Sequence, residues 1–142
     1  MKVVNSLLIV DDNAFDVEIA QRILARTGRF KHIIAVSDGR EALDLFRDYN
    51  ASRAKYPEEF PPLVILLDIN MPVLDGFAFL DAYAQLELPE DMKSSIVIML
   101  TSSSCYPDRE RALSHTMVED YIVKPLTKSH AIKLADRLGR LL

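Results

Sequence analysis

Short apolar runs alternate along the chain with segments in which apolar residues recur every three or four positions. A short unbroken apolar run bounded by turn residues predicts a buried strand, and helical spacing predicts an amphipathic helix. Strands are predicted at residues 7–10, 32–36, 63–67, 96–100 and 121–123. Helices are predicted between and after them, at residues 15–26, 38–46, 75–86, 107–113 and 128–140.

This alternation predicts an α/β fold: a doubly wound, five-stranded parallel sheet in a three-layer sandwich with five helices. The flavodoxin-like strand order 2-1-3-4-5 is expected, with the functional site where strands 1 and 3 diverge. Residues 50–62 break the pattern because they are polar, charged and rich in proline. We interpret them as a fraying helix end followed by a long connection. The 142 residues are expected to form one domain with no output domain.

Composition narrows the class of protein further. The net charge of −4 argues against a nucleic-acid surface, which needs a basic footprint. A single cysteine, Cys105, excludes an internal disulfide and suits a reducing cytoplasm. One cysteine and three histidines argue against a zinc site, and no apolar run is long enough to span a membrane. We therefore expect a cytoplasmic protein without nucleic-acid or membrane partners.

Polar side chains follow four of the predicted strands at the points where the strands end. Asp11 and Asp12 end the first strand, Asp68 the third, Thr101 the fourth and Lys124 the fifth. Because parallel strands end at the same edge of a sheet, these groups are expected to converge there. An unpaired carboxylate is costly to bury, so Asp68 is expected at the edge of the sheet rather than within it.

The pattern resembles the receiver domain of bacterial response regulators, the family of the chemotaxis regulator, in its stand-alone form. The resemblance covers nearly the whole chain and rests on four motifs in order. These are the pair Asp11-Asp12, the block LDINMPVLDG at residues 67–76, the strand end Thr101-Ser102, and Lys124-Pro125. Each motif alone is weak, but their order and shared position make the combination specific.

The resemblance implies a site chemistry that the residues themselves support. Asp68 would be the phosphoacceptor, with Lys124 pairing first with it and then with the phosphoryl group. Asp11 and Asp12, with Asp68 and the backbone carbonyl of Asn70, would hold Mg²⁺. Clustered carboxylates need a cation, and Mg²⁺ prefers such oxygen ligands. The protein would then be a signalling phosphoacceptor with self-catalysed phosphotransfer and autodephosphorylation, not an enzyme.

The resemblance also implies a switch. The Thr101 hydroxyl would move to bond the phosphoryl group, and Tyr121 would turn into the space that it leaves. The Lys124–Pro125 peptide bond is expected to be cis, as it is in the family, although this isomer is a minority form. One or two charge-assisted hydrogen bonds suffice to shift such a two-state equilibrium.

The expected partners follow from the same resemblance. They are a sensor histidine kinase of the phytochrome-like or hybrid type, or a histidine phosphotransfer protein, and a downstream protein target. The chain would be a monomer or a weak homodimer. The apolar end at residues 138–142 could add to a dimer interface, although covering the core is the favoured use.

Simpler interpretations and two other functional classes stand beside this one. Asp11, Asp12 and Asn13 could merely cap a helix, and Thr101 could bond a local backbone group. A pseudo-receiver would bind partners without taking phosphate. A phosphatase of the haloacid-dehalogenase type also uses a strand-end aspartate with Mg²⁺, but its DxD spacing near the first strand is missing here.

Overall fold

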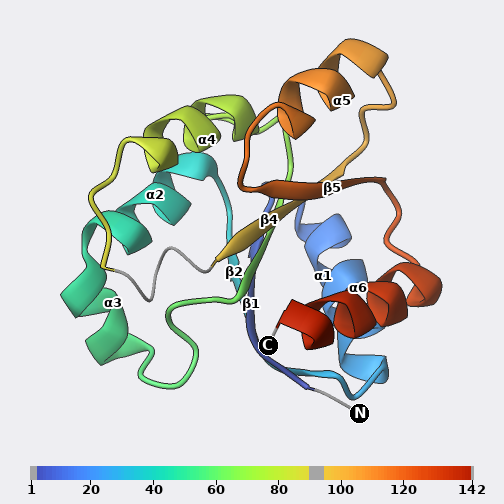
Figure 1. Cartoon of the computed structure of the whole chain (residues 1–142), viewed down its shortest axis with the longest axis horizontal. Helices are drawn as coiled ribbons and strands as arrows, with labels where there is room; N and C mark the ends of the chain where they lie inside the picture. Colours follow the sequence, from blue (N-terminus) through green and yellow to red (C-terminus); the bar gives the residue numbers. More distant parts are fainter. Residues whose placement is uncertain (1–2, 90–94, 142) are drawn as a thin grey trace.

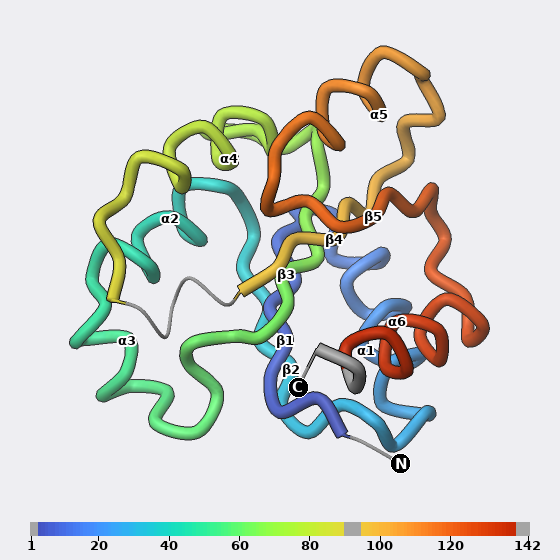
Figure 2. Tube along the Cα trace, in the orientation of Figure 1, coloured from blue at the N-terminus to red at the C-terminus, as the bar shows by residue number. Residues whose placement is uncertain are grey.

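The sheet is parallel throughout and has the predicted order. The structure is a computed structural model that describes residues 3–89 and 95–141. Its described strands form one sheet with the order β2-β1-β3-β4-β5 (Figures 1 and 2). The strands are β1 (Val4–Val10), β2 (Phe30–Val36), β3 (Val64–Leu67), β4 (Ile96–Thr101) and β5 (Val118–Val123). The flavodoxin-like fold is confirmed.

Helices cover both faces of the sheet, which gives the three expected layers. The helices are α1 (Ala14–Arg26), α2 (Gly39–Arg47), α3 (Tyr49–Lys55), α4 (Gly76–Ala84), α5 (Tyr106–Leu113) and α6 (Lys128–Leu141). Figure 1 shows α1 and α6 together on one side of the sheet, with α2, α3 and α4 on the other. Two apolar clusters correspond to these two interfaces, one built with α2 and α4 and the other with α1 and α6. No helix in the described ranges has both the length and the apolar character that crossing a bilayer requires.

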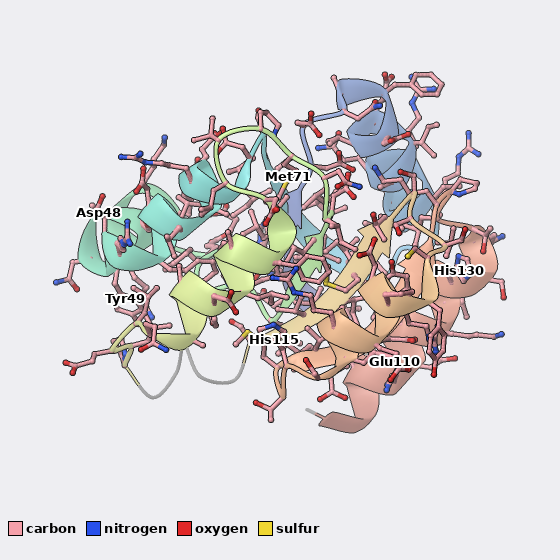
Figure 3. All side chains as sticks on the ribbon, turned by 90° about the horizontal axis from the view of Figure 1, so that it is seen from above. Asp48, Tyr49, Met71, Glu110, His115 and His130 are labelled. Carbon is pink, nitrogen blue, oxygen red and sulfur yellow. The ribbon has the colours of Figure 1, made fainter. Side chains whose placement is uncertain are left out.

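One helix was not expected, and the interpretation of residues 50–62 is partly wrong. The backbone of Asp48 leaves the helical region at the end of α2, and α3 begins directly after it at Tyr49; Figure 3 labels both residues. The buried Ser52 hydroxyl donates to the Leu45 carbonyl at 2.6 Å, which ties α3 to α2. The irregular connection is therefore only residues 56–63, and the described chain has six helices rather than five.

Two strands, β1 and β5, begin earlier in the chain than the apolar pattern predicts. β1 begins at Val4 rather than residue 7, because it alternates there between buried Val4, exposed Asn5 and buried Ser6. β5 begins at Val118 and includes the polar pair Glu119-Asp120. Where one face of a strand meets solvent, apolar and polar residues alternate. A search for unbroken apolar runs therefore misses the first residues of these two strands.

The end of α6 covers the core, as far as its described side chains extend. Leu138 is fully buried in the cluster that α6 builds with α1. The side chains of residues 139–141 and all of Leu142 lie outside the described part of the chain. Leu138 itself thus supports the core-covering interpretation over a dimer interface.

The β3 strand and the loop after it fix the centre of the sheet's functional edge. All four residues of β3 are buried, between β1 on one side and β4 on the other (Figure 2). The following loop folds back so that the Gly76 amide donates to the Ile69 carbonyl at 2.8 Å. A Cβ atom at Gly76 would collide with the Asp68 carbonyl oxygen and lie 2.9 Å from the Ile69 Cα. Only glycine fits this approach without moving the backbone.

We expect Gly76→Ala to lower the free energy of unfolding by about 2 kcal/mol, because the atoms it meets are backbone and cannot swing aside. Urea denaturation measures this loss. Gly28→Ala is the matched control, since Gly28 has a positive φ of 66° but open space around it. Alanine there loses only about 1 kcal/mol from backbone strain. Equal losses in the two variants would contradict a rigid contact at Gly76.

Candidate functional site

Four strand ends deliver polar residues to one edge of the sheet. Each residue is still tied to a neighbouring strand through its backbone, although it lies at or beyond the last strand position. The Asp11 amide donates to Val36 at 3.1 Å, and the Asp68 amide donates to Val10 at 3.0 Å. The Lys124 amide donates to the Thr101 carbonyl at 2.8 Å. The sheet therefore fixes the spacing of these residues.

Asp68 is almost completely buried, with 5% of its surface exposed. One carboxylate oxygen, Oδ1, accepts a hydrogen bond from the Ile69 amide at 2.7 Å. The other, Oδ2, lies 3.1 Å from the Lys124 ammonium. The carboxylate is thus oriented by one backbone donor and one cation, which are the partners that a buried anion needs.

Asp11, Asp12 and Asp68 form a carboxylate cluster at this edge. Each offers an oxygen, and these oxygens all lie within 4.8 Å of one another. Burial raises the pKa of Asp11, and the negative charge of Asp68 adds to the rise, whereas bonds from Lys124 and the Asn13 amide oppose it. Asp12 is exposed, and Asn70 is exposed in the loop two residues after Asp68. Oxygen-only donors with excess negative charge fit a hard divalent cation such as Mg²⁺.

Lys124 lies at the centre of the site. The Lys124–Pro125 bond is cis, as predicted. The ammonium contacts Asp11 at 2.7 Å, Asp16 at 2.8 Å and Asp68 at 3.1 Å. Burial alone would lower the pKa of Lys124, but these three hydrogen-bonded carboxylates outweigh it and raise the pKa. The lysine therefore stays charged at neutral pH.

Asp16 is the site residue that sequence reasoning missed. It lies in the first turn of α1, where an acidic side chain is easily explained by the helix dipole. Its amide donates to the Asn13 side chain at 3.1 Å, so Asn13 does cap the helix. The cap interpretation therefore holds for Asn13, whereas Asp11 contacts Lys124.

Thr101 and Tyr121 are connected through one residue, Ser103. Thr101 is fully buried, and its hydroxyl oxygen accepts a hydrogen bond from the Ser103 amide at 3.4 Å. Tyr121 is 6% exposed, and its hydroxyl donates to the Ser103 carbonyl at 2.8 Å. The predicted switch has Tyr121 turning inward on phosphorylation, but the ring already lies inward in this structure.

The family model for the response regulator receiver domain matches residues 7–136, which include every site residue described above. The chain belongs to this receiver domain family. Receiver domains are the signalling domains of two-component systems, and they bind Mg²⁺ through acidic residues. This receiver has an acidic cluster of its own at the edge of the sheet, formed by Asp11, Asp12 and Asp68.

Solved structures of response regulators share the fold. A two-component response regulator from Cytophaga hutchinsonii is 29% identical, with a TM-score of 0.83 over 98% of this chain and 99% of that one. The bacteriophytochrome response regulator RtBRR is 30% identical, with a TM-score of 0.74 over 96% of this chain and 79% of that one.

Curated relatives place the receiver in proteins of very different length. The "Probable methanogenesis regulatory protein FilR2" of Methanothrix harundinacea is 31% identical over 121 residues, 85% of this chain and 72% of that protein. Relatives also include a hybrid signal transduction histidine kinase of Dictyostelium discoideum, of which the receiver spans 6%. The same domain thus occurs both as most of a protein and as a small part of one.

Proposed function

We propose that this receiver accepts a phosphoryl group on Asp68 and acts as a two-component phosphorelay switch through protein contacts. One observation carries the proposal: a buried carboxylate at a strand end, bonded to a charged lysine and adjoining two more carboxylates. A carboxylate in this setting is a nucleophile with its orientation already fixed. The lysine supplies positive charge where charge develops on the phosphoryl oxygens.

The reaction is a displacement at phosphorus. An Asp68 carboxylate oxygen attacks, an O–P bond forms, and the bond from phosphorus to the donor group breaks. The donor is a phosphohistidine of the partner protein, or acetyl phosphate in a test tube, and imidazole or acetate leaves. The signal ends by hydrolysis: water attacks the same phosphorus, the bond from phosphorus to Asp68 breaks, and inorganic phosphate and the free carboxylate are released. Throughout, Lys124 stabilises the phosphoryl oxygens as a fixed point charge.

Asp11, Asp12 and Asp68 would hold Mg²⁺, together with the Asn70 carbonyl. When bound, the ion neutralises negative charge on the phosphoryl oxygens. The Asn13 amide orients the Asp11 carboxylate for this role by donating a hydrogen bond to its Oδ1 at 2.9 Å. Asp12, being exposed, leaves the site open to water and to the phosphoryl donor.

The output would run through Thr101, Ser103 and Tyr121. A phosphoryl group on Asp68 would draw the Thr101 hydroxyl toward it as a donor. Because the Tyr121 ring is already inward, we propose that this bond holds the ring there rather than pulling it in. The surface formed by α5 and β5 would then become more rigid, and a downstream protein would bind this more rigid surface.

The proposed partners are a histidine kinase of the phytochrome-like or hybrid type, or a histidine phosphotransfer protein. The likeness to a bacteriophytochrome response regulator supports the first type, and the hybrid kinase relatives support the second. We propose a cytoplasmic location and a monomer or weak homodimer, with no nucleic-acid contact of its own.

Intact mass measurement after incubation with Mg²⁺ and acetyl phosphate tests the function. The expected result is one added phosphoryl group per chain, lost again over time. An absence of any adduct with several phosphodonors would favour a pseudo-receiver that only binds partners. Steady multiple-turnover hydrolysis of a phosphate ester would instead favour a phosphatase.

Mg²⁺ should stabilise the fold, because the cluster is preformed only in the folded chain. At ten times its dissociation constant the ion adds about 1.4 kcal/mol, which raises the Tm by about 5 °C in a domain of this size. Thermal unfolding with and without Mg²⁺ measures the shift. Asp12→Ala should lose most of it, whereas the exposed Asp44→Ala, on α2, should keep it. An equal shift in both variants would argue against the cluster as the binding site.

A further inference from the structure

The three hydrogens of the Lys124 ammonium are all in use. They meet Asp11, Asp16 and Asp68, and the contact with Asp68 is the longest, at 3.1 Å against 2.7 and 2.8 Å. An ammonium group has no fourth donor. A phosphoryl oxygen that binds Lys124 must therefore displace one of the three carboxylates.

Asp16 differs from the other two carboxylates in its surroundings. Asp11 and Asp68 belong to the cluster with Asp12 whose oxygens lie within 4.8 Å of one another, and a bound cation would take up their charge. Asp16 is not among the residues of that cluster. Its side chain is 32% exposed, compared with 4% for Asp11 and 7% for Asp68. A cation bound to the cluster would therefore not be held by Asp16, which stays beside the lysine.

A chain of hydrogen bonds holds Asp16 in this position. The Asp16 amide donates to the Asn13 side chain at 3.1 Å, and the Asn13 amide donates to Asp11 Oδ1 at 2.9 Å. Lys124 closes the ring by contacting both Asp11 and Asp16. The first turn of α1 therefore holds the Asp16 carboxylate in contact with the ammonium.

We propose that Asp16 competes with the phosphoryl group on Asp68 for the Lys124 ammonium, and so limits how tightly the site holds a phosphoryl group. The proposal rests on the phosphoacceptor role of Asp68. A phosphoryl group brings a charge of about −1.5 to −2, and a fixed carboxylate on the same lysine opposes it. Asp16 is thus a built-in restraint on the phosphorylated state, acting through the lysine rather than on the phosphoryl group directly.

If Asp16 had a purely structural role, its replacement would affect stability but not anion binding. An acidic residue in the first turn stabilises a helix through its dipole. Loss of that effect would change the Tm but would leave the affinity of the site for an anion unchanged. Anion affinity therefore separates the two roles.

The experiment titrates beryllium fluoride, an anionic phosphoryl analogue, into the protein at saturating Mg²⁺ and follows binding by fluorine NMR. Asp16→Asn keeps an acceptor oxygen but removes the charge, and it should bind about tenfold more tightly, or ~1.4 kcal/mol. Asp16→Glu restores a carboxylate and should return the affinity toward that of the unchanged protein. Glu18→Gln is the matched control, since Glu18 lies on the same helix and pairs with Arg22.

Each outcome bears on a distinct claim. Unchanged or weaker binding by Asp16→Asn would overturn the competition, even if its Tm changes. Equal tightening in Glu18→Gln would also overturn it, because the effect would then come from the general charge of α1. If the unchanged protein neither binds beryllium fluoride nor takes phosphate from acetyl phosphate, the proposed function fails and this inference fails with it.

Discussion

Asp68→Asn is expected to abolish phosphoryl incorporation, with at least a hundredfold less adduct after incubation with Mg²⁺ and acetyl phosphate. The amide has the shape of the carboxylate but is not a nucleophile toward phosphorus. Asp68 is the carboxylate that follows the central strand β3, where the Ile69 amide and the Lys124 ammonium orient its two oxygens. Intact mass measurement reads the result directly.

The fold of this variant should survive, which makes the result interpretable. Lys124 keeps two carboxylate partners, Asp11 and Asp16, and one negative charge leaves a crowded site. The control is Asp44→Asn, an exposed aspartate on α2 that should be phosphorylated like the unchanged protein. Persistent adduct in Asp68→Asn, mapped by peptide mass to another residue, would show that the acceptor has been assigned wrongly.

Lys124→Met is expected to lower the free energy of unfolding by about 3 kcal/mol at neutral pH without Mg²⁺. Methionine fills much of the same volume, but it leaves Asp11 and Asp68 buried without their cation, and removing one partner of a buried pair is strongly destabilising. Phosphoryl incorporation should also slow by at least tenfold, because the variant lacks the positive charge that stabilises the phosphoryl group during transfer. Urea denaturation and the rate of adduct formation measure the two effects.

Two conditions should partly rescue this variant. Mg²⁺ supplies positive charge to the same carboxylates. Lower pH acts through Asp11: burial raises its pKa in the unchanged protein and the bond from Lys124 opposes that rise, so the variant, which lacks the bond, has an Asp11 pKa raised further. The folded variant therefore binds this proton more tightly than the unchanged protein does, so the deficit should shrink as pH falls through the pKa that Asp11 has in the variant. The exposed Lys128→Met should show neither the deficit nor the rescue. A deficit that is independent of Mg²⁺ and pH would indicate lost packing instead.

The residues at the strand ends were predictable because the end of a buried strand is set by the local run of apolar residues. An apolar run that stops at an aspartate or a lysine places that residue at the sheet edge, and a parallel sheet brings all such edges together. This is why the convergence of Asp11, Asp68, Thr101 and Lys124 could be derived without coordinates. The strand order was instead expected from the common flavodoxin-like arrangement of alternating strands and helices.

Asp16 could not be derived in this way. Its contact with Lys124 joins residues 108 positions apart and depends on how α1 sits against the end of β5. From the sequence alone, an aspartate in a first turn is already explained by the helix. Tyr121 is similar, because whether its ring lies inward is a choice of side-chain rotamer that no local pattern encodes. For α3, the buried hydroxyl of Ser52 replaces the apolar stripe that a pattern search requires.

The complete burial of β3 has a consequence for where motion can occur. Amide hydrogens of a central, doubly covered strand exchange with solvent only when most of the domain opens. The Asp68 amide, which bonds to Val10, should share this slow exchange. The proposed acceptor is therefore the stationary element of the switch. Any response to phosphate has to be carried by the loops that bear Ser103 and Lys124, whose amides we expect to change their exchange rates while those of β3 do not.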